Sequence, residues 1–141
     1  METKELKVLV PDGYEIDKEN STFECIKFKK KSISFVDIIN KYENGYSIKL
    51  LATSNNHMNK ILALNNLMLV AKYLNKNWVP EFNRYRQAKY YISISDDKLS
   101  IDRCYCVNKG AGIFFRMEEL AQQAIELLGE ETIKLALSPN Y

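Results

Sequence analysis

Apolar and polar residues are arranged in strand-like and helix-like patterns in the first part of the chain. Residues 6–10 are rich in β-forming side chains, and residues 22–28 alternate between apolar and polar positions. The turn sequence Pro11-Asp12-Gly13 and a polar stretch separate them, so we expect an antiparallel hairpin with a long connection. Residues 34–42 place apolar side chains at helical spacing behind Ser34, a residue type that caps helices, and predict a short helix.

The second part of the chain predicts a helix, a sheet and two further helices. A long segment carries the broad apolar stripe of an amphipathic helix, and three later segments have a period of two. Asp96-Asp97 forms the first strand turn, and Gly129 separates the last two helices. The predicted elements are a helix over 59–75, strands over 89–95, 99–107 and 113–116, and helices over 117–128 and 130–137.

These elements place the chain in the α+β class. We expect an N-terminal β-hairpin and short helix, then a helix, a three-stranded antiparallel meander and C-terminal helices packed on one sheet face. The length of 141 residues fits a single α+β domain over 1–141. The polar stretch 43–58 is the best candidate for an internal boundary, between an N-terminal subdomain, 1–45, and a C-terminal subdomain, 57–138.

Composition narrows the functional classes. Hydrophobic residues make up 46% and charged residues 27% of the chain, which is typical of a globular protein and excludes intrinsic disorder. The formal net charge of +2 lacks the strong basic balance of many nucleic-acid-binding proteins. No apolar run approaches the roughly 20 residues of a membrane span, and no export signal precedes residue 11. We therefore expect a cytoplasmic protein without membrane contact, whose three cysteines are free thiols.

Residues that could support catalysis or metal binding are few. His57 is the only histidine, and its neighbours include no carboxylate that could orient it as a general base. Cys104 and Cys106 share one face of a predicted strand, but Cys25 is distant in sequence and a second ligand pair is missing. The sequence therefore indicates no metal site, no cofactor and no catalytic group. An unrecognised enzyme that uses His57 or the cysteines is the least favoured alternative.

Basic and aromatic residues gather in two segments, which raises the alternative of single-stranded nucleic-acid binding. Aromatic residues flanked by cations can stack on bases, although a sheet that packs on helices also uses such rings in its core. In this interpretation exposure of Tyr85, Tyr90 and Tyr91 beside the cations would favour base stacking. The candidate nucleic-acid-binding residues are Lys27, Lys29, Lys30, Lys31, Arg84, Arg86, Lys89, Tyr90 and Tyr91.

The segment between the long helix and the sheet offers a candidate protein-binding anchor. Trp78 and Phe82 flank a proline, and exposed aromatic residues of this kind often anchor a partner protein. The same residues can instead fill the corner where a helix meets a sheet.

Several motifs resemble small, uncharacterised prophage and mobile-element proteins of anaerobic gut bacteria. The similar segments are residues 10–17, 20–24, 26–29, Leu74-Asn75, Trp78-Val79-Pro80, Lys89-Tyr90-Tyr91-Ile92, Phe114-Phe115, Ala121 and Ala124-Ile125. The resemblance implies a phage-like cytoplasmic accessory protein, and it transfers no catalytic or binding residue. Together with the residue patterns it favours a non-catalytic accessory or protein-interaction module whose partner is another protein.

Overall fold

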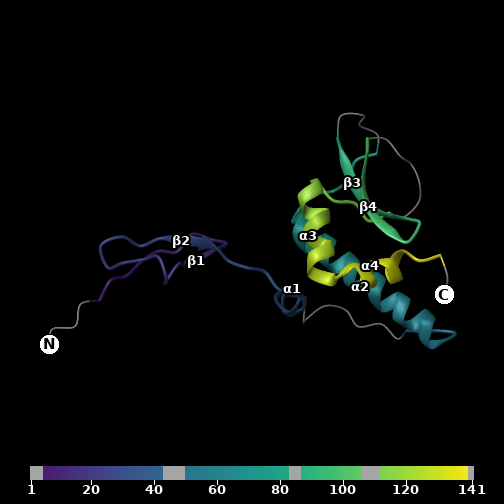
Figure 1. The fold of residues 1–141 in the computed structure, drawn as a ribbon, viewed down its shortest axis with the longest axis horizontal. Helices are drawn as coiled ribbons and strands as arrows, with labels where there is room; N and C mark the ends of the chain where they lie inside the picture. The colour runs from purple at the N-terminus through teal and green to yellow at the C-terminus, as the bar shows by residue number, and fades with distance from the viewer. Residues whose placement is uncertain (1–4, 43–49, 83–86, 106–111, 140–141) are drawn as a thin grey trace. The chain divides into compact units, whose positions relative to one another are not determined.

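The computed structural model describes residues 5–42, 50–82, 87–105 and 112–139. Within these residues the chain forms two antiparallel hairpins and four helices, an α+β fold (Figure 1). Contacts between residues divide the chain into two compact units, Met1–Ile33 and Ser34–Tyr141, and each unit holds one of the hairpins. The division into subdomains 1–45 and 57–138 stays a prediction.

The first unit is organised around the hairpin of β1 (Tyr14–Ile16) and β2 (Phe28–Lys30). The strands are antiparallel, with Tyr14 opposite Lys30 and Ile16 opposite Phe28. Among residues 5–33 no side chain is buried. A two-stranded ribbon of this kind is marginally stable by itself, because it lacks a hydrophobic core.

The predicted first strand of this hairpin, residues 6–10, is wrong. Tyr14 donates its backbone N–H to the Pro11 carbonyl at 3.1 Å, and Gly13 has a φ of +81°. The Pro-Asp-Gly turn therefore precedes the paired strand instead of ending it. β-Propensity describes a segment that fits a sheet, but it does not say which of two candidate segments pairs with the partner strand.

The second unit begins with α1 (Phe35–Lys41), which confirms the predicted short helix. Ser34 and Asp37 form a reciprocal cap, in which the Ser34 hydroxyl accepts the Asp37 N–H at 3.3 Å and the Asp37 carboxylate accepts the Ser34 N–H at 2.8 Å. Ile38 is fully buried, and the Lys41 ammonium lies 4.8 Å from the centre of the Tyr73 ring. Burial raises the pKa of the Tyr42 phenol above its ordinary value of 10.0, with a further contribution from Tyr73.

The long helix α2 (Asn55–Asn75) begins four residues before the predicted start at residue 59. The Ser54 hydroxyl accepts the N–H of His57 at 3.1 Å, and the His57 Nδ1 atom accepts the N–H of Thr53 at 3.0 Å. These bonds satisfy backbone donors at the helix start, so the polar residues before residue 59 belong to the first turn.

The second hairpin pairs β3 (Lys89–Ser95) with β4 (Lys98–Cys104) and confirms the predicted turn at Asp96-Asp97. Both aspartates have positive φ, 50° and 60°, as a two-residue turn between twisted strands requires. Ile92 lies opposite Ile101 in this register. One face of the hairpin is therefore apolar at its centre.

The three-stranded meander is wrong for the part of the chain that the structure describes. Phe115 makes only a single bridge to Tyr90, in which Tyr90 N–H donates to Phe115 O at 2.9 Å and Phe115 N–H to Tyr90 O at 2.7 Å. The bridge uses the edge of β3 that faces away from β4, whereas a meander would place the third strand beside β4. Helix α3 begins at Glu118, so the segment is too short to extend the ladder in that direction.

A side chain of α2 holds the other side of this segment. The Asn75 amide donates from Nδ2 to Phe114 O at 2.7 Å, and its Oδ1 accepts Arg116 N–H at 2.9 Å. Asn75 is buried, so both amide groups satisfy backbone groups where water is largely excluded. We call this pair of bonds the Asn75 clamp, which joins the end of α2 to the segment that contacts β3.

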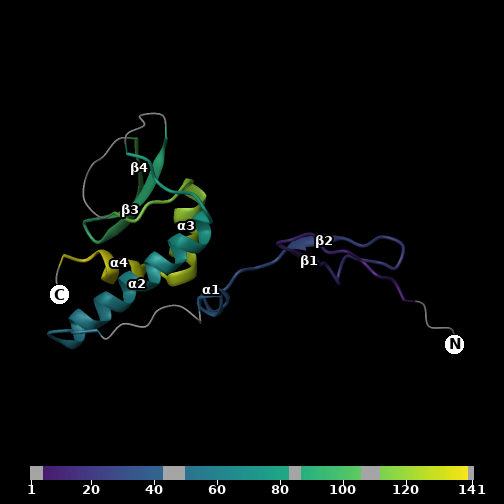
Figure 2. The same ribbon diagram turned by 180° about the vertical axis from the view of Figure 1, so that it is seen from behind.

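Helices α3 (Glu118–Leu128) and α4 (Glu130–Leu137) match the predicted pair and meet at Gly129, whose φ is +84°. Both helices contact α2 and the β3–β4 hairpin, and the two opposite views show them grouped with α2 (Figures 1 and 2). The core of the described residues lies wholly in this second unit. Its buried apolar residues are Ile38, Ala63, Leu67, Val70, Ala71, Leu74, Ile92, Phe115, Ala121, Ala124, Ile133 and Ala136.

The clamp predicts a strong effect of substitution at Asn75. Asn75→Ala leaves Phe114 O and Arg116 N–H without a partner, so we expect the free energy of unfolding to fall by on the order of 2–4 kcal/mol. Asn75→Asp keeps an acceptor for the Arg116 N–H but places a second acceptor oxygen against the Phe114 carbonyl. This variant should therefore also lower the free energy of unfolding. Urea denaturation of the full chain measures both effects.

The matched control for this prediction is Asn77→Ala, because Asn77 is exposed just beyond the same helix. We expect the control to change stability by less than about 0.5 kcal/mol. An equally small effect of Asn75→Ala would contradict the clamp.

Candidate functional site

The N-terminal hairpin has one apolar face and one charged face. Residues directly opposite each other in an antiparallel pair share a face, and successive residues alternate between faces. The apolar face is formed by Tyr14, Ile16 and Phe28, with Lys30 beside Tyr14. The charged face is formed by Glu15, Asp17, Lys27 and Lys29.

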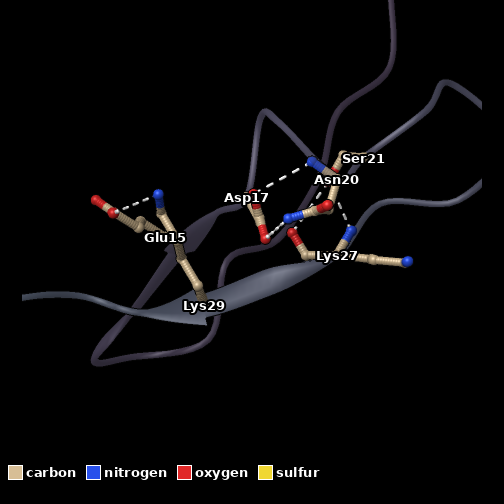
Figure 3. Close-up of polar contacts among 6 residues, drawn as sticks. All are labelled: Glu15, Asp17, Asn20, Ser21, Lys27 and Lys29. Atoms are coloured by element: carbon tan, nitrogen blue, oxygen red, sulfur yellow. Dashed lines mark hydrogen bonds and ion pairs between the residues drawn. The ribbon is translucent and has the colours of Figure 1, made fainter.

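Local polar contacts hold the hairpin in shape (Figure 3). The Asn20 amide donates to the Asp17 carboxylate at 2.8 Å, and the Asn20 N–H donates to the same group at 3.3 Å. The Ser21 hydroxyl accepts the Lys27 N–H at 2.8 Å. The Glu15 carboxylate and Lys29 ammonium are 3.7 Å apart, an exposed ion pair that adds little stability.

Apolar side chains outside the strands are also exposed in this unit. Phe23 lies at the tip, where Thr22 and Cys25 exchange backbone hydrogen bonds of 2.9 and 3.2 Å, and 62% of its surface is exposed. Leu9 is 96% exposed, and Leu6 is exposed by about half. Local hydrogen bonds therefore fix the backbone of the unit, while its apolar side chains are not buried within it.

The four lysines of the predicted nucleic-acid site are all exposed. Lys27 and Lys29 lie on the charged face, Lys30 lies on the apolar face, and Lys31 follows β2. Lys31 donates its backbone N–H to the Gly13 carbonyl at 3.0 Å, which extends the pairing by one residue. The cluster therefore divides between the two faces of a narrow ribbon.

The second predicted basic segment lies partly inside the fold. Arg84, Tyr85 and Arg86 lie outside the described residues. Lys89 is 0% exposed, and its ammonium donates to Gln87 O at 3.0 Å and to Tyr105 O at 2.6 Å. The Lys89 ammonium is therefore bonded to two backbone carbonyls within the chain, and its contact with a phosphate stays a prediction.

Tyr90 and Tyr91 are half-buried in β3. Tyr90 bonds to Phe115 through its backbone, and the Tyr91 ring meets the Phe114 ring edge-on with centroids 6.1 Å apart. Both residues therefore contribute to packing around the Asn75 clamp. Base stacking by them stays a prediction.

The predicted anchor residues Trp78 and Phe82 are also half-buried. Phe82 meets the Phe114 ring edge-on at 5.2 Å, and the Lys89 ammonium lies 5.2 Å from the centre of the Phe82 ring. Trp78 donates its backbone N–H to Asn75 O at 3.0 Å. Phe82 thus packs beside Lys89 of β3, and Trp78 is bonded to the end of α2. The role of both residues in binding a partner stays a prediction.

The candidate catalytic and metal-ligating residues are not brought together in the described residues. His57 helps to cap α2, as above, and Thr53 Oγ1 also lies 3.0 Å from its Nδ1 atom. Cys25 is exposed in the first unit and Cys104 is half-buried in the second, while Cys106 lies outside the described residues. A search of the described residues finds no cluster of three His, Cys, Asp or Glu side chains placed to hold a metal ion.

Sequence reasoning missed a polar cluster on β3 and β4. The Ser93 and Ser100 hydroxyls are 2.8 Å apart, and both donate to the Asp102 carboxylate. A hairpin whose turn is Asp96-Asp97 places Ser93 opposite Ser100. The predicted turn was therefore the signal in the sequence that could have identified this contact. The cluster joins β3 to β4 through side chains on one face of the hairpin.

None of the helices in the described part of the chain is both long enough and apolar enough to span a membrane. Searches of protein-family models, curated proteins and solved structures found no match to the chain.

The polar network of the first hairpin predicts a pH dependence. The hydrogen bond from the Asn20 side chain is the main cause that lowers the pKa of the Asp17 carboxyl below its ordinary value of 3.8. Because the folded-state pKa is the lower one, the stabilisation is complete above about pH 3.8 and disappears as the pH falls through the folded-state value. NMR titration of the Asp17 carboxyl carbon measures this pKa.

Asn20→Ala is the control for this titration, because it removes the main cause and leaves the carboxyl in place. We expect the Asp17 pKa to rise toward 3.8 in this variant. The same Asp17 pKa in both proteins would show that the hairpin network does not persist in solution.

Proposed function

We propose that this chain is a non-catalytic accessory protein that binds another protein through the apolar face of its N-terminal hairpin. One observation carries the proposal: Tyr14, Ile16 and Phe28 share one face of a hairpin unit in which no described residue is buried. Association removes such apolar surface from water and stabilises a ribbon that has no core. The phage-like context that the sequence resemblance implies is part of this proposal.

The chemistry of the face indicates the kind of partner. Its centre is apolar and aromatic, and Lys30 lies at its border opposite Tyr14. The side chain of Lys31 follows directly and is exposed. We therefore expect a partner protein with an apolar surface and acidic groups at its rim, where these lysines favour association.

Site-specific cross-linking in the source cell tests the proposal on the full chain. The photoreactive residue p-benzoylphenylalanine replaces Phe28 on the apolar face or, as the control, Lys29 on the charged face. We expect a protein adduct from the Phe28 position and little or none from the Lys29 position. The adduct identifies a partner that can then be purified for binding measurements.

Matched variants then test whether the face itself binds this partner. Ile16→Ser on the apolar face should raise the dissociation constant about fivefold or more, since loss of a central contact residue costs over ~1 kcal/mol. Glu15→Ser on the neighbouring position of the charged face should leave binding nearly unchanged.

Other outcomes overturn the proposal. Equal cross-linking from both positions, or cross-links only to residues 34–141 of the same chain, would show that the apolar face binds no partner protein. Adducts with single-stranded nucleic acid from the Lys29 position alone would instead favour the alternative function, in which the exposed lysines 27, 29, 30 and 31 contact phosphates.

A further inference from the structure

The second unit contains a half-open, mainly apolar cavity that the hairpin function does not use. The cavity has a volume of about 320 Å³ and lies among α2, the β3–β4 hairpin, the segment that follows residue 111 and the end of α4. Leu64, Leu67, Ile92, Phe114, Phe115 and Leu137 form most of its wall.

The wall chemistry selects for an uncharged ligand. Tyr91 and Cys104 carry the polar side chains of the lining, and none of the described lining residues is charged. A charged group in contact with this lining would lose part of its hydration without gaining an ion partner among the described residues, which is unfavourable. The volume is at the lower end of the roughly 300–1,000 Å³ range of small-molecule sites and about twice a cavity of ~150 Å³ that binds benzene.

Contacts around the cavity hold its wall in place. Phe115 is fixed by its two hydrogen bonds to Tyr90, and the Asn75 clamp holds the residues on either side of it. The Phe114 ring packs edge-on against two other rings, those of Phe82 and Tyr91. A cavity with a fixed wall is formed before a ligand arrives, so binding requires little reorganisation.

Gly112 contributes to this arrangement because the Phe114 ring packs directly over its backbone. A Cβ atom at Gly112 would lie 2.5 and 2.7 Å from two atoms of that ring. Any side chain at position 112 would therefore displace Phe114 from the cavity wall.

We propose that this cavity is a binding site for a small, uncharged, mainly apolar ligand of about the size of one or two fused rings. The Cys104 thiol lies at the wall, so a bound ligand covers it. This site is separate from the hairpin face, and either proposal can fail without the other.

Protection of the Cys104 thiol tests the site in the full chain. In a Cys25→Ser/Cys106→Ser background, iodoacetamide alkylates Cys104, and indole serves as the neutral probe. We expect saturating indole to slow alkylation several-fold. Indole-3-acetate, which adds a carboxylate to the same ring system, should give much less protection because its charge loses hydration against the apolar wall and finds no cation among the described lining residues.

Cavity-filling variants provide the second arm. Leu64→Trp fills the cavity from α2 and Leu137→Phe fills it from α4, so each folded variant should lose most of the indole-dependent protection. Met68→Trp is the matched control, because Met68 lies on α2 but is exposed. Circular dichroism establishes whether each variant is folded. If Leu64→Trp does not fold, Leu137→Phe provides the test.

Three results would overturn the proposal. One is the absence of indole protection up to its solubility limit, and another is equal protection by indole-3-acetate. The third is protection that persists in a folded cavity-filling variant, because the probe would then bind elsewhere.

Discussion

The organisation of the second unit depends on the side-chain amide of Asn75. A residue in an extended segment presents its backbone groups to one side, and its neighbours present theirs to the other. Phe115 bonds to Tyr90 of β3, while the adjacent Phe114 O and Arg116 N–H bond to Asn75, which takes the place of another strand. One buried amide therefore joins the end of α2 to the segment that leads into α3, and it also holds the wall of the cavity.

The two units differ in how their apolar side chains are used. In the second unit the helices and the β3–β4 hairpin share one core, whereas the described part of the first unit has no buried side chain. The first hairpin keeps its shape through local bonds such as those of Asp17 with Asn20. Its apolar face is not buried within the first unit, which is why the proposed function lies there and the proposed ligand site lies in the second unit.

Local signals in the sequence predicted much of the fold but little of the candidate sites. Ser34, the Asp96-Asp97 turn and Gly129 act within a few residues of themselves, and each has its predicted role. Strand pairing depends on distant segments, so the strand at residues 6–10 and the three-stranded meander were not predictable from propensity. The burial of Lys89 likewise depends on the carbonyl groups of Gln87 and Tyr105, one of which is 16 residues away.

Hydrogen exchange of the full chain, without a partner, tests this view of a clamped core and a coreless hairpin most directly. We predict that the amides of Tyr90, Phe115 and Arg116 exchange only through global unfolding, because they are bonded at the centre of the second unit. The amides of Asp17 and Lys27 should exchange through local opening, orders of magnitude faster. Exchange of the Arg116 amide as fast as that of Lys27 would contradict the central role of Asn75.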